Sequence, residues 1–61
     1  MWPTSCADHI VLAERYRSSQ QWIDAAIEYR KARERAKDAD AWIELLAQES
    51  EMLRRAWKEQ R

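Results

Sequence analysis

Few residues of this chain could take part in catalysis. Its single cysteine, Cys6, and its single histidine, His9, are three positions apart, which places them on one face of a helix. They could act as a nucleophile and its base, or supply half of a metal site. No second Cys/His pair accompanies them, and the sequence has no glycine with which to build a phosphate-binding loop. We therefore predict a protein that is not an enzyme, with no catalytic, cofactor-binding or metal-binding residues.

The overall charge of the chain is balanced. Its 61 residues include 11 acidic and 11 basic side chains, and the formal net charge is zero. Without excess positive charge, general attraction to nucleic acid or to a membrane surface is weak. The longest apolar run, residues 10–13, is shorter than the about 20 residues of a membrane-spanning helix and than the about 7–15 residues of a signal-peptide core. We predict a cytoplasmic protein that does not contact membranes.

Positive charge is concentrated in one stretch of the sequence, residues 30–37. Acidic residues follow it at positions 38, 40 and 44, and basic charge near a helix C-terminus complements the helix dipole. On a helix the basic residues would fall on two sides and flank an apolar stripe. A nucleic-acid-associated regulator that binds through this cluster is the alternative functional prediction, although the charge balance disfavours it. The cluster consists of Arg30, Lys31, Arg33, Arg35 and Lys37.

The order of the elements follows from the scarcity of helix breakers. Pro3 disfavours helix at the preceding residue, so residues 1–4 are predicted to form a short extended lead. Residues 5–61 contain no proline or glycine and are predicted to form a single helical domain. The break near 18–21 is soft, so one helix over 5–37 is the alternative to two. We predict helices over about 5–18, 20–37 and 40–60, with a turn at 38–40, where aspartates suit a helix N-cap.

The last predicted helix has an apolar face that covers about half of its circumference. At about 100° per residue, Trp42, Leu46, Leu53 and Trp57 gather within an arc of roughly 120°. Such a face is wider than the seam of a simple two-helix contact and suits more than one neighbour. Glu49 lies within this face. Two environments are predicted for it. Its carboxylate either lies at a solvent-exposed edge of the face, or is paired within an interface with an arginine or a tryptophan N–H.

The middle predicted helix is apolar on two sides. Ile23 and Ile27 lie opposite its main stripe, so this helix is predicted to lie between two layers or to be shared with another chain. If residues 5–37 formed one helix, Leu12 and Tyr16 would align with Ile23 and Ile27. The result would be a long-helix hairpin whose spare face dimerises. The main stripe consists of Trp22, Ala25, Tyr29, Ala32 and Ala36.

An internal similarity appears at a spacing of 34 residues. This shift superposes Leu12-Ala13 on Leu46-Ala47 and His9 on Ile43. Residues 6–50 thereby resemble one tetratricopeptide-type helix pair followed by a capping helix.

Several side chains match this repeat. Tyr16 falls at the aromatic position of the repeat's first helix and Trp22 at the one that opens its second helix. Ala25, Tyr29 and Ala32 then match the small–aromatic–small pattern of the second helix. His9, Gln20 and Lys37 depart from the pattern, which usually has a large aromatic, a glycine and a proline there. The resemblance implies protein binding.

The size of the chain and its four tryptophans favour association. A core this small is marginally stable, and self-association is a common remedy; tryptophan is also enriched at interfaces. We predict an all-α fold, either a small helical hairpin or a repeat-like three-helix bundle, completed by dimerisation.

The predicted function is a non-enzymatic protein–protein interaction module. It would be a small homodimeric regulator or inhibitor, of the phage or bacterial accessory type, that docks on a larger protein. The candidate interface residues are Tyr16, Trp22, Ile23, Ile27, Tyr29, Trp42, Leu46, Glu49, Leu53 and Trp57.

Overall fold

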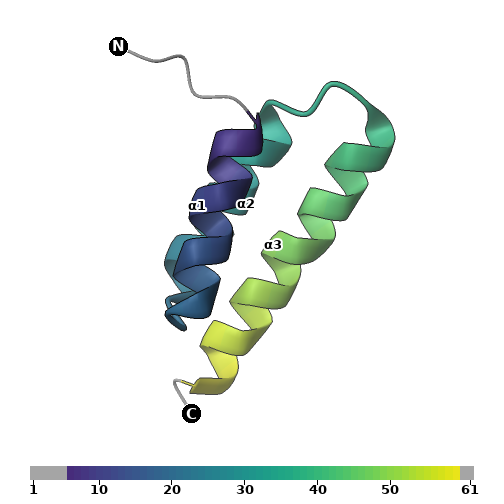
Figure 1. Ribbon diagram of the computed structural model, residues 1–61. Helices are drawn as coiled ribbons and strands as arrows, with labels where there is room; N and C mark the ends of the chain where they lie inside the picture. Colours follow the sequence, from purple (N-terminus) through teal and green to yellow (C-terminus); the bar gives the residue numbers. More distant parts are fainter. Residues whose placement is uncertain (1–5, 60–61) are drawn as a thin grey trace.

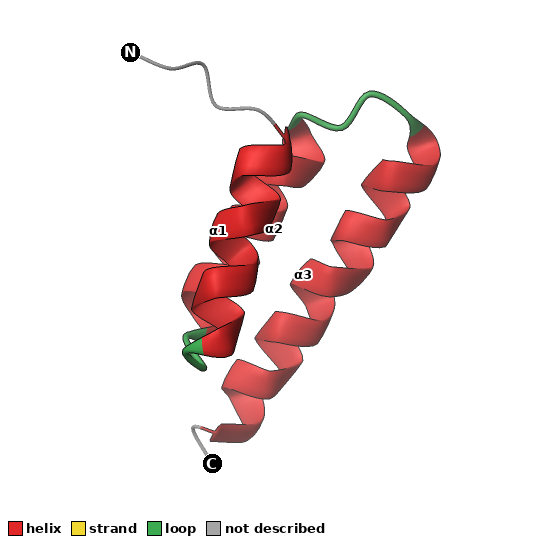
Figure 2. Ribbon diagram, viewed as in Figure 1, coloured by secondary structure: helices red, strands yellow, loops and turns green. Residues whose placement is uncertain are grey.

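The computed structural model describes residues 6–59, which form three helices (Figure 1). Helix α1 spans Cys6–Ser18, α2 spans Trp22–Glu34 and α3 spans Ala39–Glu59. Short connections join them, and within this range there is no strand (Figure 2). The prediction of an all-α fold is confirmed, and its three helices are those of a small helical bundle.

Helix α2 is the central element. It packs against both neighbours, whereas α1 and α3 barely touch each other and run in the same direction (Figure 1). The Cα atoms extend over 36 × 27 × 13 Å, and the three helices form one curved layer in which α1 and α3 flank a groove floored by Tyr29 of α2. The outer side of this layer, away from the groove, is not covered by residues 6–59.

The structure differs from the expected helix bounds at both connections. The alternative of one helix over 5–37, and with it the long-helix hairpin, fails because the chain turns back at residues 19–21. The helix expected over 20–37 ends at Glu34, and the turn expected at 38–40 is replaced by a connection over residues 35–38. The extended lead predicted for residues 1–4 lies outside the described residues.

The core is built largely from alanine. Ala25 and Ala32 of α2 and Ala13 of α1 are fully buried, and so is Met52 of α3. Because alanine side chains are small, the backbones of neighbouring helices approach closely on both sides of α2. Tyr29 and Leu45 fill the remaining space. The main stripe of the middle helix is therefore buried, whereas Ile23 and Ile27 on its other side are exposed.

The connection between α2 and α3 ends in an aspartate cap. The Ala41 N–H donates to Oδ1 of Asp38 at 2.8 Å, and the Trp42 N–H donates to the Asp38 carbonyl at 3.1 Å. An N-cap residue adopts a non-helical backbone conformation. Since Asp38 caps α3, α2 must end before it, and the Arg35 and Ala36 N–H groups close the last turn of α2 on the carbonyls of Ala32 and Arg33.

The turn between α1 and α2 is a Schellman motif. The Gln21 N–H donates to the Tyr16 carbonyl at 2.8 Å, and the Gln20 N–H donates to the Arg17 carbonyl at 3.0 Å. This motif requires a left-handed residue at its centre. Gln20 occupies that position with a φ of 61°, a conformation that strains any residue with a Cβ.

Replacing Gln20 by glycine should therefore stabilise the protein. Gln20→Gly removes the left-handed strain, and we expect a gain of about 1 kcal/mol in the free energy of unfolding. For a domain of this size that gain corresponds to a rise of about 4–8 °C in melting temperature by circular dichroism. The matched control is Gln21→Gly, because Gln21 has a φ of −91° and no strain to relieve. Equal effects of the two substitutions would contradict the assignment.

Candidate interaction surface

A broad apolar surface lies on one side of the α2–α3 pair. Most of the exposed large apolar side chains belong to these two helices, and the most exposed are Trp57, at 64% of its full accessibility, and Ile43, at 59%. Leu46 is half-buried beside them. We call this surface the α2–α3 face. It consists of Ile23, Ile27, Trp42, Ile43, Leu46, Leu53 and Trp57.

Helical geometry places the α3 part of this face on one side of the layer. Ala41 and Gln48 of α3 line a groove of about 310 Å³ on the opposite side, together with Ile10 of α1. At 100° per residue, Leu46 and Leu53 point about 140–160° away from Gln48. The α2–α3 face therefore lies on the side of α3 away from the groove.

Arg33 connects α2 to α3 at the edge of this face. Its Nε donates to Oε1 of Glu49 at 3.1 Å, and its Nη2 lies 3.0 Å from the same oxygen. The guanidinium also lies over the Trp42 ring, 5.3 Å from the ring centroid. Glu49 was predicted either to lie at a solvent-exposed edge or to be a paired carboxylate. The structure shows it paired, with an arginine of its own chain. The side chain of Glu49 is only 15% exposed.

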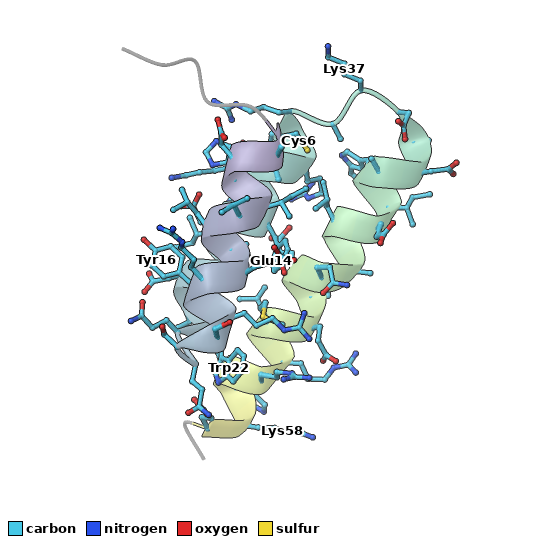
Figure 3. The ribbon with its side chains drawn as sticks, in the orientation of Figure 1. Cys6, Glu14, Tyr16, Trp22, Lys37 and Lys58 are labelled. Atoms are coloured by element: carbon cyan, nitrogen blue, oxygen red, sulfur yellow. The ribbon has the colours of Figure 1, made fainter. Side chains whose placement is uncertain are left out.

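A second cation–π contact lies at the other end of the helix pair. The Arg55 guanidinium is 5.3 Å from the centroid of the Trp22 ring. Figure 3 shows Trp22 beside the C-terminal half of α3. Contacts of this kind contribute about 0.5–1 kcal/mol at exposed sites. Together with the Arg33–Trp42 contact, this one fixes how α3 is rotated against α2.

A buried polar pair connects α1 to α2. Nδ1 of His9 lies 2.8 Å from Oε1 of Glu28, and the two residues are 6% and 8% exposed. An ionised carboxylate only accepts hydrogen bonds, so the imidazole Nδ1–H is the donor. Lys31 Nζ lies 3.5 Å from the other Glu28 oxygen. Sequence analysis did not predict this pair, because the two residues are 19 positions apart on different helices and nothing in the sequence relates one to the other.

The predicted site residues fall into two groups. Ile23, Ile27, Trp42, Leu46, Leu53 and Trp57 come together in the α2–α3 face, with Glu49 at its inner edge. Tyr29 is instead buried at the floor of the groove, while Tyr16 and Trp22 are half-buried against the core. Ile43 belongs to the α2–α3 face but was not among the predicted interface residues. It is apolar and adjoins the apolar face of the last helix, so the sequence contained the signal that could have identified it.

Cys6 and His9 do not form a shared site. Cys6 lines the groove between α1 and α3, whereas His9 turns to Glu28 on α2. Within residues 6–59, no three His, Cys, Asp or Glu side chains are grouped so that they could hold a metal ion. His9 Nε2 is buried and has no hydrogen-bond partner in this part of the chain.

The basic cluster is dispersed and largely paired. Because α2 ends at Glu34, Lys37 lies beyond the helix and does not share a helix side with Arg30 and Arg33 as expected, whereas Arg35 follows directly at the C-cap. Lys37 projects from the connection (Figure 3). The other four have partners in the chain: Arg30 with Glu34 at 3.8 Å, Lys31 with Glu28, Arg33 with Glu49, and Arg35 with the Lys31 carbonyl at 3.4 Å.

Comparisons with known proteins give no match: no protein-family model, curated protein or solved structure is similar to this chain. None of the helices within residues 6–59 combines the length and apolar character needed to cross a membrane.

Removing one partner of the His9–Glu28 pair should cost more stability than removing both. Glu28→Ala leaves the Nδ1–H of His9 buried without an acceptor, so we expect a loss of about 1–3 kcal/mol in the free energy of unfolding by urea titration. The double variant His9→Leu/Glu28→Met removes both polar groups and should recover most of that loss. Glu34→Ala is the matched control, because its exposed ion pair should contribute less than about 1 kcal/mol. A Glu28→Ala loss no larger than the control would contradict the prediction.

Proposed function

We propose that this chain is a non-enzymatic protein-interaction module of the cytoplasm that forms a homodimer and, as a small regulator or inhibitor, docks on a larger protein. The α2–α3 face carries the proposal. Its apolar side chains come from two adjacent helices and lie on one side of the layer. A contiguous apolar surface of this kind on a soluble protein is typical of an interaction site.

The size of this face supports the proposal. Six of its side chains are about half exposed, and a buried aromatic side chain contributes about 150–250 Å². The exposed apolar area is therefore on the order of 600 Å² per chain, at the upper end of what monomers leave uncovered. A standard interface buries about 800 Å² on each partner, which this apolar area and a polar rim would supply.

The tetratricopeptide-like helix pair is part of the same proposal. Ala25, Tyr29 and Ala32, the small–aromatic–small positions of the resemblance, face the neighbouring helices and are buried. This packing supports a repeat-like helix pair followed by a capping helix, α3. Protein binding is the role that this resemblance implies.

The nucleic-acid alternative has less support. Arg30, Lys31 and Arg33 lie beside carboxylates, so their charges are largely neutralised before any phosphate approaches. We expect no saturable, salt-dependent binding of duplex or single-stranded DNA in a fluorescence-anisotropy titration at low salt. Binding that weakens steeply with salt and is lost in Arg35→Ala/Lys37→Ala would instead favour this alternative.

The dimer should depend on Trp57 more than on a matched exposed residue elsewhere. Trp57→Ala should raise the dimer dissociation constant by about 30-fold in sedimentation equilibrium, because interfacial tryptophans are frequent hot spots of about 2 kcal/mol or more. It should change monomer stability little, since Trp57 is largely exposed. Val11→Ala is the control, an exposed apolar residue of α1 outside the face. A wild-type chain that stays monomeric at all concentrations would refute the dimer.

Docking on a larger protein is tested separately. Affinity capture from host cells should retain a partner on the wild-type chain that Trp57→Ala retains poorly. A partner retained equally by both chains would place docking outside the α2–α3 face.

A further inference from the structure

The apolar residues on the outer side of α3 are arranged symmetrically about the middle of the helix. Leu46 and Leu53 lie equally far from the midpoint between Glu49 and Ser50, and so do Trp42 and Trp57. Ser50, a small exposed residue, lies beside this midpoint. We call these five residues the α3 seam. Its order is nearly the same when the helix is followed in either direction.

Such a seam is complementary to itself in the antiparallel direction. We propose that two copies of the chain pair through α3 in antiparallel orientation, with the two-fold axis beside Ser50. In this register Trp42 lies against the partner's Trp57, and Leu46 lies against the partner's Leu53. The inference rests on the proposed function, because it specifies the orientation and register of that homodimer.

The charges beside the seam favour the antiparallel direction over the parallel one. Asp40 and Lys58 are exposed, lie on the same flank of α3 and occupy opposite ends of it. An antiparallel pair places Asp40 beside the partner's Lys58, and Lys58 beside the partner's Asp40. A parallel pair places the two copies of this flank on opposite sides of the interface, so neither contact forms there. Two attractive contacts therefore favour the antiparallel direction.

The dimensions of the seam agree with a helix–helix contact. From Trp42 to Trp57 it extends over about 22 Å at 1.5 Å per residue, or roughly four turns. A small residue at the crossing point, Ser50, lets the two helix axes approach to about 8–10 Å. Ile43 lies on the same side and adds to the contact near the partner's Trp57. Ile23 and Ile27 of α2 are exposed and lie outside the α3 seam, so the antiparallel contact does not depend on them.

Cysteine cross-linking tests the register. Each variant is made in a Cys6→Ser background, which leaves one thiol per chain. Ser50→Cys lies next to the proposed two-fold axis and should form a disulfide-linked dimer on mild oxidation, because the two Cα atoms come within the about 4.4–6.8 Å that a disulfide needs. Leu46→Cys should not cross-link, since the antiparallel register separates the two residues by about 10 Å along the helix axis, whereas a parallel pair would place them side by side. Efficient cross-linking at Leu46 would overturn the inference in favour of a parallel dimer.

A charge exchange tests the same register without a covalent bond. Asp40→Lys and Lys58→Asp should each weaken the dimer by about 3–10-fold in sedimentation equilibrium, because each creates two like-charge contacts. The double exchange should restore the dissociation constant to within about twofold of wild type. Thermal melts of the same variants control for changes in helix stability. A dimer that shows neither cross-linking at Ser50 nor rescue by the exchange would refute the register and leave the proposed association standing. A monomer at every concentration would refute both.

Discussion

The close approach of α2 to both neighbours is the constraint on which the rest of the molecule depends. Ala25, Ala26 and Ala32 have so little side chain that α1 and α3 can each pack tightly against the same central helix. Close packing on both sides maximises dispersion contacts in a chain with few residues to bury. It also leaves the molecule a single layer of helices. The outer sides of α2 and α3 therefore have no covering element within the chain.

This arrangement explains why large apolar side chains are exposed while the core contains mainly alanine. In a two-layer domain Trp57, Ile43 and Leu53 would have a second layer to pack against. Here they lie outside the layer, and burial within the chain falls to smaller residues. Arg33 partly compensates at one end, since its guanidinium covers the Trp42 ring and pairs with Glu49. The apolar side chains that stay exposed form the surface on which the proposed association is based.

Sequence analysis predicted the helices well and their ends less well, for physical reasons. The absence of proline and glycine after Pro3, and the apolar periodicity of residues 40–60, are strong signals because they act over many residues. The turn at Gln20 gives a weak signal, because glutamine is rarely left-handed. Its backbone hydrogen bonds, from the Gln20 and Gln21 N–H groups to the Arg17 and Tyr16 carbonyls, close the end of α1 through backbone atoms that leave no mark in the sequence. The members of the α2–α3 face were largely predicted, but the pairing of Glu28 with His9 depends on helix packing and was not.

The two polar contacts between helices give the layer a specificity that alanine packing alone would lack. Alanine surfaces are smooth, and helices that meet through them can slide by a turn with little change in buried area. Hydrogen bonds are directional and short-ranged. His9 with Glu28 sets the register of α1 on α2, and Arg33 with Glu49 sets that of α3 on α2. A shift of either helix would leave a buried or half-buried charge unpaired, which costs several kcal/mol. The Arg33–Glu49 pair therefore favours the rotation of α3 that places its apolar seam on the side away from the groove.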